Sequence, residues 1–208
     1  FPKIADALKS RLVLFSGTPC QVAGLYSFLQ GEPKNLFTID IVCHGVGSPG
    51  FFSSFLSELG QKEGMKPNHV NFRYKGDGWR WFAMEFSYGI SKKVIKPSFD
   101  VSYMSGFLSS LILRPSCYRC SWARLPRMGD LTLGDFWGVG ENPKFGPLPT
   151  EEQLGVSLLL ANSSRGTDFI NSCQSDFVLV SRSLMQAVEG NPNLRIPTKE
   201  PLEREKVF

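Results

Sequence analysis

The apolar and polar positions at the start of the chain switch from a strand-like to a helix-like period. A short helix is expected over residues 2–9, and an apolar run over 11–15 predicts a buried strand. Thr18, Pro19 and Gln21 then form a helix start: Thr18 can cap the helix, Pro19 suits its first position, and Gln21 completes a capping box. The first thirty residues therefore predict a helix, a strand and a second helix.

A second strand and helix follow directly. The apolar stretch NLFTIDIVC, residues 35–43, predicts another buried strand. Ser48 can cap a helix that Pro49 opens and that runs to about Leu59. Two strands joined by a helix are expected to be parallel neighbours in one sheet.

The middle of the chain has a different pattern. Three stretches alternate apolar with polar residues, which predicts an antiparallel meander over 69–75, 80–88 and 91–96. Residues 101–113 have a helical pattern that Pro115 is expected to stop.

The last third mixes strands with a helix and loops. We expect a polar loop over 141–155 and, from Gly190, an extended tail. The elements expected here are strands over 130–138, 156–162 and 177–181 and a helix over 167–176. The whole pattern predicts the α/β class: a parallel strand-helix-strand core with an antiparallel meander, and a mixed sheet. One domain is expected over 1–195, with an extended charged tail over 196–208.

Composition narrows the class of protein. The 208 residues are 42% hydrophobic and 20% charged, as in a soluble globular protein, and no apolar run approaches the ~20 residues of a membrane helix. A net charge of +4 is too small to indicate nucleic-acid binding. Five cysteines at unequal spacings do not form a secreted disulfide framework, which indicates a cytoplasmic protein. The chain begins at Phe1 rather than Met, so we expect it to be a piece of a longer protein.

Two cysteines follow the two predicted parallel strands. Cys20 comes just after the first strand and Cys43 ends the second. Because the carboxyl ends of parallel strands lie on one edge of a sheet, the two thiols could be neighbours in space. Cys20 also lies in the first helical turn, where the backbone N–H groups and the helix dipole favour a thiolate.

A second pair of cysteines, Cys117 and Cys120, forms a C-x-x-C motif after a proline break. With Cys20 and Cys43 they make four thiolates, the number that a [4Fe-4S] cluster needs and that zinc would also accept. A thioredoxin-like dithiol is a third interpretation, although such motifs usually follow a strand and open a helix. Cys173 lies in an apolar helical pattern and is expected to be a small buried side chain.

Three further features could carry chemistry. His44 directly follows Cys43 and could donate a proton or make a structural hydrogen bond. In GDLTLGDFWG, Asp130, Asp135 and Trp137 lie between glycines, a pattern that could wrap a planar cofactor or form a tight turn. Four arginines around the C-x-x-C motif could face an anionic substrate, phosphates or an acidic ferredoxin, or form a solvated loop: Arg114, Arg119, Arg124 and Arg127.

Four segments together resemble one known family. LFSGTPCQVAGL, TIDIVCHGVGSP, LRPSCYRC and GDLTLGDFWGV occur in this order and are similar to the coenzyme F-420 hydrogenase/dehydrogenase beta-subunit family, over about residues 10–195. Members are iron–sulfur flavoproteins, some of which reduce coenzyme F-420; a plant relative reduces a hydroxymethyl chlorophyll, and many bacterial members have no assigned substrate. The resemblance implies a cluster at the four cysteines and an FAD flavin lined by Gly17, Thr18 and Pro19.

Two hypotheses follow. In the first, the chain is an iron–sulfur and flavin-dependent oxidoreductase, or its electron-transfer subunit, with a ferredoxin or another oxidoreductase subunit as its redox partner and coenzyme F-420 as a possible substrate. In the second, the same four cysteines bind zinc in a non-catalytic docking module. An empty site is a third possibility, because clusters are easily lost in air.

Overall fold

The computed structural model describes residues 1–76, 78–79, 82–147 and 154–207, which form two compact units. Unit 1 comprises Phe1–His44, Arg119–Pro149 and Val156–Pro197, and unit 2 comprises Gly45–Tyr118, Thr150–Gly155 and Thr198–Phe208. Compact units are not the same as independently folding domains, and one domain over 1–195 stays a prediction.

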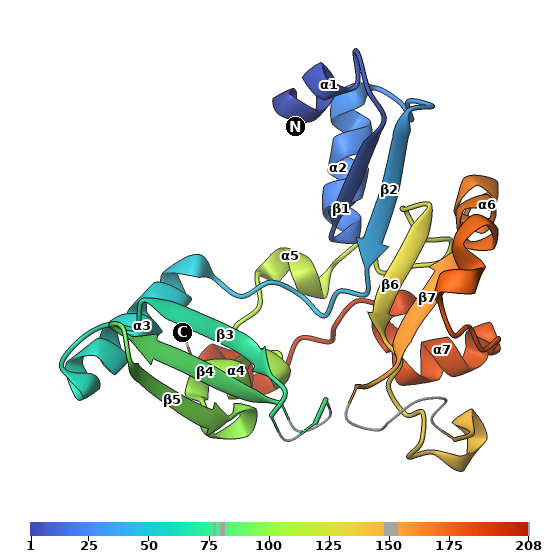
Figure 1. The fold of residues 1–208 in the computed structure, drawn as a ribbon. Coiled ribbons are helices and arrows are strands. Elements are labelled where there is room, and N and C mark those ends of the chain that lie inside the picture. Colours follow the sequence, from blue (N-terminus) through green and yellow to red (C-terminus); the bar gives the residue numbers. More distant parts are fainter. Residues whose placement is uncertain (77, 80–81, 148–153, 208) are drawn as a thin grey trace. The chain divides into compact units, whose positions relative to one another are not determined.

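Unit 1 contains a four-stranded mixed sheet in the order β1-β2-β6-β7 (Figure 1). The strands are β1 (Val13–Gly17), β2 (Leu36–Ile41), β6 (Leu131–Asp135) and β7 (Ser157–Ala161). β1, β2 and β6 are parallel, and β7 pairs antiparallel with β6. The parallel strand-helix-strand core is confirmed.

The helix that connects β1 and β2 starts as its sequence predicts. In α2 (Pro19–Leu29), Pro19 stands in the first turn, and the Gln21 side chain accepts the Thr18 backbone N–H at 2.9 Å. Val22 and Leu25 are fully buried, whereas Phe28 is half exposed. The helix ends at Gln30, whose backbone is left-handed.

The described part of unit 1 contains three further α-helices. They are α1 (Pro2–Ala7), α6 (Ser164–Cys173) and α7 (Leu184–Gly190). The Ser163 side chain caps α6 by accepting the Gly166 N–H. A hydrophobic core cluster of unit 1 contains Phe136, Val139, Phe145, Leu158, Ala187 and Leu194.

The predicted strand over 177–181 is wrong. This segment contains no strand, and its apolar residues Phe177–Val180 are 45–76% exposed. Residues 181–183 instead lead into α7, where Ser183 and Gln186 form a capping box. High β propensity is not sufficient for a strand, because a strand also needs a paired neighbour.

The predicted extended tail is also only partly right. Beyond Gly190 the chain forms two short 3-10 helices, and Leu194, the last residue of the first one, is completely buried. The short 3-10 helices of the chain are η1 (Ser98–Asp100), η2 (Pro143–Phe145), η3 (Gln174–Asp176), η4 (Pro192–Leu194) and η5 (Leu202–Lys206). In the predicted loop 141–155, residues 148–153 lie outside the described residues; Phe145 in its described part is buried.

Unit 2 contains the predicted antiparallel meander, in the order β3-β4-β5 (Figure 1). Its strands are β3 (His69–Tyr74), β4 (Ala83–Tyr88) and β5 (Lys92–Pro97), and its helices are α3 (Pro49–Glu63), α4 (Ser102–Leu108) and α5 (Pro115–Tyr118). Residues 80–81 of the predicted second strand lie outside the described residues. Phe55, Met84, Phe86, Tyr88, Val101 and Met104 form its core. The mixed α/β fold class is thus confirmed.

One helix prediction in unit 2 needs correction. The helix predicted over 101–113 ends at Leu108, two residues before Ser110, whose φ of 63° is left-handed. Pro115 does not end a helix but begins α5. Proline lacks an N–H, and this costs nothing in the first turn of a helix, where N–H groups have no intrahelical partner.

Candidate functional site: the carboxyl edge of the parallel strands

Two cysteines leave the sheet of unit 1 at matching positions. Gly17 on β1 pairs with Asp40 on β2 in a parallel register. Cys20 follows Gly17 by three residues, and Cys43 follows Asp40 by three. Both thiols therefore belong to segments that leave the same edge of the sheet, as the sequence predicts.

Cys20 is exposed in the first turn of α2. Its sulfur lies 3.1 Å from the Thr18 hydroxyl oxygen, so the residue that begins the helix also contacts the thiol.

The division of the chain into the two units falls within the C-x-x-C motif. Cys117 lies in α5 of unit 2, and Cys120 is in unit 1. The sulfur of Cys117 accepts the Val46 backbone N–H at 3.4 Å. Both cysteines are half-buried. Unit 1 therefore contains three of the four predicted ligands, and unit 2 contains the fourth.

Four thiolates are the kind of ligand set that an iron–sulfur centre uses. None of the five cysteines, all of which are described, forms a disulfide, and the sulfurs of Cys20 and Cys117 have polar neighbours of the kind that tune such centres. Across residues 1–76, 78–79, 82–147 and 154–207, however, no group of three or more His, Cys, Asp or Glu side chains is arranged to hold a metal ion. The four-cysteine centre thus stays a prediction.

A buried ion pair lies just before Cys43. The Arg127 guanidinium donates to one oxygen of Asp40, with Nη2–Oδ1 at 2.7 Å and Nε–Oδ1 at 3.2 Å, and both side chains are fully buried. The same oxygen accepts the Thr132 hydroxyl at 2.9 Å. The other oxygen accepts the backbone N–H groups of Met128 (3.1 Å) and Gly129 (2.8 Å).

A second carboxylate, that of Asp130, lies just before β6 and joins this strand to β2. Asp130 accepts from the Thr38 N–H at 2.9 Å and from the Ser163 hydroxyl at 2.6 Å. It also pairs with Arg165 at 3.0 Å. The Tyr26 hydroxyl lies 2.6 Å from the Thr38 hydroxyl oxygen, and burial raises the pKa of Tyr26 above its usual value. The two carboxylates join β2 and β6 by polar contacts as well as by their ladder.

Sequence reasoning missed this polar network. The signal was present in LFTIDI, where Thr38 and Asp40 share the buried face of β2 with Leu36. A charged residue on the inner face of an otherwise apolar strand requires a partner. The pattern could have located Asp40, but not Arg127, which is 87 residues away.

The residues predicted to line a flavin also lie near this edge. Gly17 ends β1, Thr18 and Pro19 begin α2, and Asp135 ends β6 two residues before Trp137. The Asp135 carbonyl accepts the Asn191 side-chain amide at 2.9 Å.

The glycine next to Trp137 is explained by packing inside the protein. A Cβ on Gly138 would lie 2.1 Å from the Phe145 ring, and the φ of Gly138 is +90°. The Phe145 ring stacks with Phe136. The tight turn with a buried aromatic therefore accounts for this glycine without a cofactor, and the flavin contacts stay predictions.

The histidine and the arginines have different surroundings. His44 is half-buried directly after Cys43, and its role as a proton donor stays a prediction. Arg114, Arg119 and Arg124 are exposed, with Arg124 over the Trp122 ring at 5.4 Å. Arg127 is neither in a solvated loop nor facing an outside anion, because it is buried against Asp40. Cys173 is half-buried at the end of α6, where its sulfur lies 3.1 Å from the Phe169 carbonyl oxygen.

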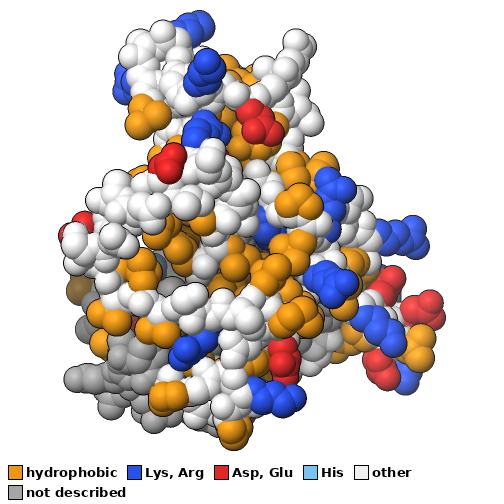
Figure 2. Space-filling model, turned by 90° about the vertical axis from the view of Figure 1, so that its right-hand side faces the viewer, with side chains coloured by type: hydrophobic (Ala, Val, Ile, Leu, Met, Phe, Trp, Pro, Cys, Tyr) orange, Lys and Arg blue, Asp and Glu red, His pale blue; other side chains and the backbone are white. Residues whose placement is uncertain are grey.

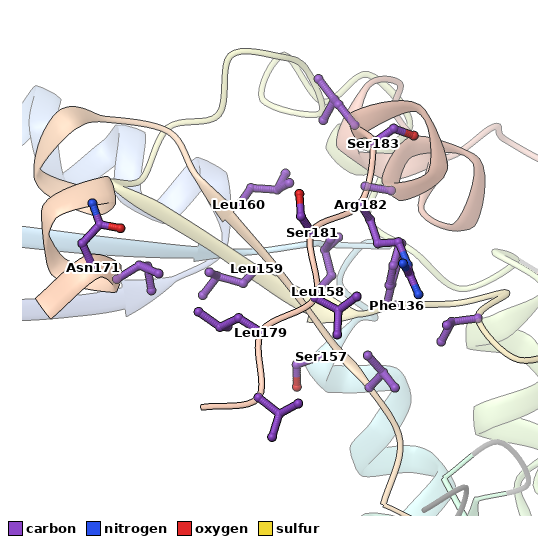
Figure 3. Close-up of a pocket in the computed structure, with 17 residues that line it drawn as sticks. Phe136, Ser157, Leu158, Leu159, Leu160, Asn171, Leu179, Ser181, Arg182 and Ser183 are labelled. Carbon is purple, nitrogen blue, oxygen red and sulfur yellow. The ribbon is translucent and has the colours of Figure 1, made fainter. Parts of the chain in front are cut away.

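Unit 1 also has an apolar groove of about 580 Å³ beside its edge strand β7. Figure 3 shows Leu158, Leu159 and Leu160 of β7 close to Leu179 and Ser181 of the segment that precedes α7. Figure 2 shows hydrophobic side chains at the molecular surface, interspersed with Lys and Arg. The groove contains none of the predicted site residues.

No described helix is long and apolar enough to cross a membrane. The fold defines an α/β protein with cysteines in the segments that follow two parallel strands. The chain belongs to a family of oxidoreductase subunits: residues 10–186 match the model of the carboxyl-terminal region of the coenzyme F420 hydrogenase/dehydrogenase beta subunit. The description of the family as a beta subunit implies an enzyme with other subunits. No curated protein matches the chain in a sequence comparison.

Proposed function

We propose that this chain is the electron-transfer part of an iron–sulfur and flavin-dependent oxidoreductase, in which Cys20, Cys43, Cys117 and Cys120 hold a [4Fe-4S] cluster. The observation that carries the proposal is the parallel register of β1 and β2 in a chain of this family. Because of this register, the segments that contain Cys20 and Cys43 leave the sheet at the same edge. Ligand sites in open α/β sheets lie at this edge.

The chain's own residues would hold and tune the centre. Such a cluster, when bound, accepts and passes on single electrons, and a flavin converts single-electron steps into hydride transfer. The Val46 N–H points to the Cys117 sulfur and the Thr18 hydroxyl contacts the Cys20 sulfur, so both would stabilise negative charge on these sulfurs.

The flavin part of the proposal rests on the family. FAD would lie along Gly17, Thr18 and Pro19, with Asp135 and Trp137 at the end of β6. His44 would donate a proton to the bound substrate. Coenzyme F-420 is a candidate substrate.

The proposed partner is a ferredoxin or another subunit of the enzyme. Exposed guanidinium groups at Arg114, Arg119 and Arg124 lie close in sequence to the C-x-x-C motif and would suit an acidic partner surface. A cytoplasmic location is part of the proposal, since cysteines without disulfides are typical of a reducing compartment.

Anaerobic purification of the full chain, with analysis of iron, sulfide, zinc and flavin, tests the proposal. We expect brown protein with iron and acid-labile sulfide in equal amounts. Serine at any one of the four cysteines should remove the centre, because a hydroxyl is a far poorer iron ligand than a thiolate. Cys173→Ser is the matched control and should leave the iron content unchanged.

Two results would contradict the proposal. Colourless protein with one zinc per chain, lost on substitution of the same cysteines, would favour the docking module. Iron that persists when Cys20 or Cys43 is replaced would show that these thiols are not ligands.

A further inference from the structure

We propose that the buried Arg127–Asp40 ion pair is a positioning device that holds the Cys120 segment against the strand that ends before Cys43. The inference rests on the proposed function, because it assigns a role in assembling that iron–sulfur site. Arg127 and Asp40 would act through the cysteine segments and would touch no ligand themselves.

The Arg127 guanidinium reaches beyond Asp40. It also donates to the Ile41 carbonyl oxygen at 3.2 Å and to the Trp122 carbonyl oxygen at 3.4 Å. Ile41 lies two residues before Cys43, and Trp122 lies two residues after Cys120. A single buried side chain therefore joins the backbones that precede one cysteine and follow the other.

The Asp40 carboxylate is held rigidly. Its Oδ2 accepts two backbone N–H groups, of Met128 and Gly129, and its Oδ1 accepts the Thr132 hydroxyl. There is no room for a side chain at Gly129, where a Cβ would lie 2.6 Å from the Asp40 nitrogen. Hydrogen bonds thus hold both oxygens of the Asp40 carboxylate, which accepts the Arg127 guanidinium. Because Arg127 also donates to the backbone of the Cys120 segment, the fixed carboxylate fixes the position of that segment.

A second ion pair in the same sheet lacks this connection. The Asp130–Arg165 pair also joins β2 to β6, and Arg165 donates to the Leu36 carbonyl oxygen at 2.9 Å. Leu36 is at the start of β2, whereas Ile41 is at its end, next to the Cys43 segment. Arg165 contacts Lys34, Leu36 and Asp130, and none of these is within two residues of a cysteine. This pair is therefore a structural control for Arg127.

The test compares Arg127→Gln with Arg165→Gln in the full chain. Iron binding is measured by anaerobic reconstitution of the folded protein, together with the electron paramagnetic resonance spectrum of the reduced centre. Replacing a residue that orients metal ligands typically weakens metal binding by about 10–100-fold. We expect a loss of this size, and an altered spectrum, for Arg127→Gln alone.

A second readout needs no metal. In protein with serine at Cys20, Cys117 and Cys173, a bifunctional thiol reagent measures how often Cys43 and Cys120 approach one another. Arg127→Gln should lower the yield of the cross-link several-fold, and Arg165→Gln should not. If Arg127→Gln does not fold, Arg127→Lys replaces it, because an ammonium keeps the charge but lacks the planar fork that reaches three acceptors.

The outcomes separate this inference from the proposed function. If the unaltered chain binds no iron, the proposed function fails, and the cross-link yield still decides whether Arg127 holds the two segments. If the Arg127 and Arg165 variants lose iron and cross-link yield in proportion to their lost thermal stability, the pair is only structural. Wild-type iron binding and cross-linking in both Arg127 variants would also overturn the inference.

Discussion

Arg127 Nη2 lies 2.7 Å from Asp40 Oδ1, and neither side chain is exposed to solvent. A buried charge without its partner is strongly destabilising, because its desolvation is no longer compensated. The protein is therefore expected to be sensitive to the loss of either partner of this ion pair.

Removing one partner of this pair should be costly. Arg127→Met is expected to lower the free energy of unfolding by about 3–5 kcal/mol, since Asp40 would keep a buried charge. Urea unfolding followed by circular dichroism measures the change. Lys9→Ala is the control: the Lys9–Asp6 pair is exposed and should contribute only about 0–1 kcal/mol. A similar small change for both variants would contradict the prediction.

Replacing both partners should not restore stability. In many proteins a buried ion pair can be exchanged for apolar residues without loss. Here Asp40 also accepts the half-buried N–H of Met128 and the buried N–H of Gly129, and Asp40→Leu/Arg127→Met would leave both without this acceptor. We expect the double variant to stay about 2 kcal/mol or more below the wild type in urea unfolding, from the desolvation of these groups. Wild-type stability would show that the two N–H groups find other acceptors.

Substitution by alanine should destabilise the protein at Gly129 and stabilise it at Gly50. At Gly129 a Cβ would meet the Asp40 backbone nitrogen at 2.6 Å, so Gly129→Ala should lower the midpoint of thermal unfolding. At Gly50, in the first turn of α3, the nearest atom is the Ser48 hydroxyl oxygen at 3.6 Å. Gly50→Ala should stabilise the protein by up to about 1 kcal/mol, from helix propensity. Equal effects at both positions would be inconsistent with the packing around Gly129.

Alkaline stability should depend on Tyr26. Burial raises the pKa of Tyr26 above its usual value of about 10, so the unfolded chain loses the phenolic proton first. The contribution of Tyr26 to the stability of the folded protein is complete below pH ~10 and is lost as the pH rises through the folded pKa. Stability should therefore fall less steeply above pH ~10 in Tyr26→Phe than in the wild type, as measured by urea unfolding at several pH values. Tyr88 and Tyr103 are present in both proteins and contribute equally to both curves of stability against pH. Parallel curves for the wild type and Tyr26→Phe would therefore contradict the prediction.

Leu194 should contribute more to the free energy of unfolding than the exposed apolar segment before α7. Leu194 is completely buried, and Leu194→Ala should cost about 2–5 kcal/mol. Val178 is 76% exposed, and Val178→Ala should change the free energy of unfolding by no more than about 0.5 kcal/mol. Thermal unfolding of the two variants separates these effects. A large loss for Val178→Ala would show that residues 177–181 are packed in solution.

The sequence by itself determined the elements whose signals are local. The start of α2 at Thr18 and Pro19, the buried strand β2 and the alternating strands of the meander all depend on residues within a few positions of one another. The parallel order of β1 and β2 also followed, because a helix connects them.

The tertiary structure alone decided which distant residues meet. Arg127 looked like its neighbours in a basic loop, and only folding across 87 positions buries it against Asp40. Residues 177–181 had the composition of a strand, but a strand forms only where a neighbour offers hydrogen bonds, which no local pattern encodes. The sequence thus located the cysteines at the ends of elements, while the polar network that ties their segments together arose from contacts between residues far apart in the chain.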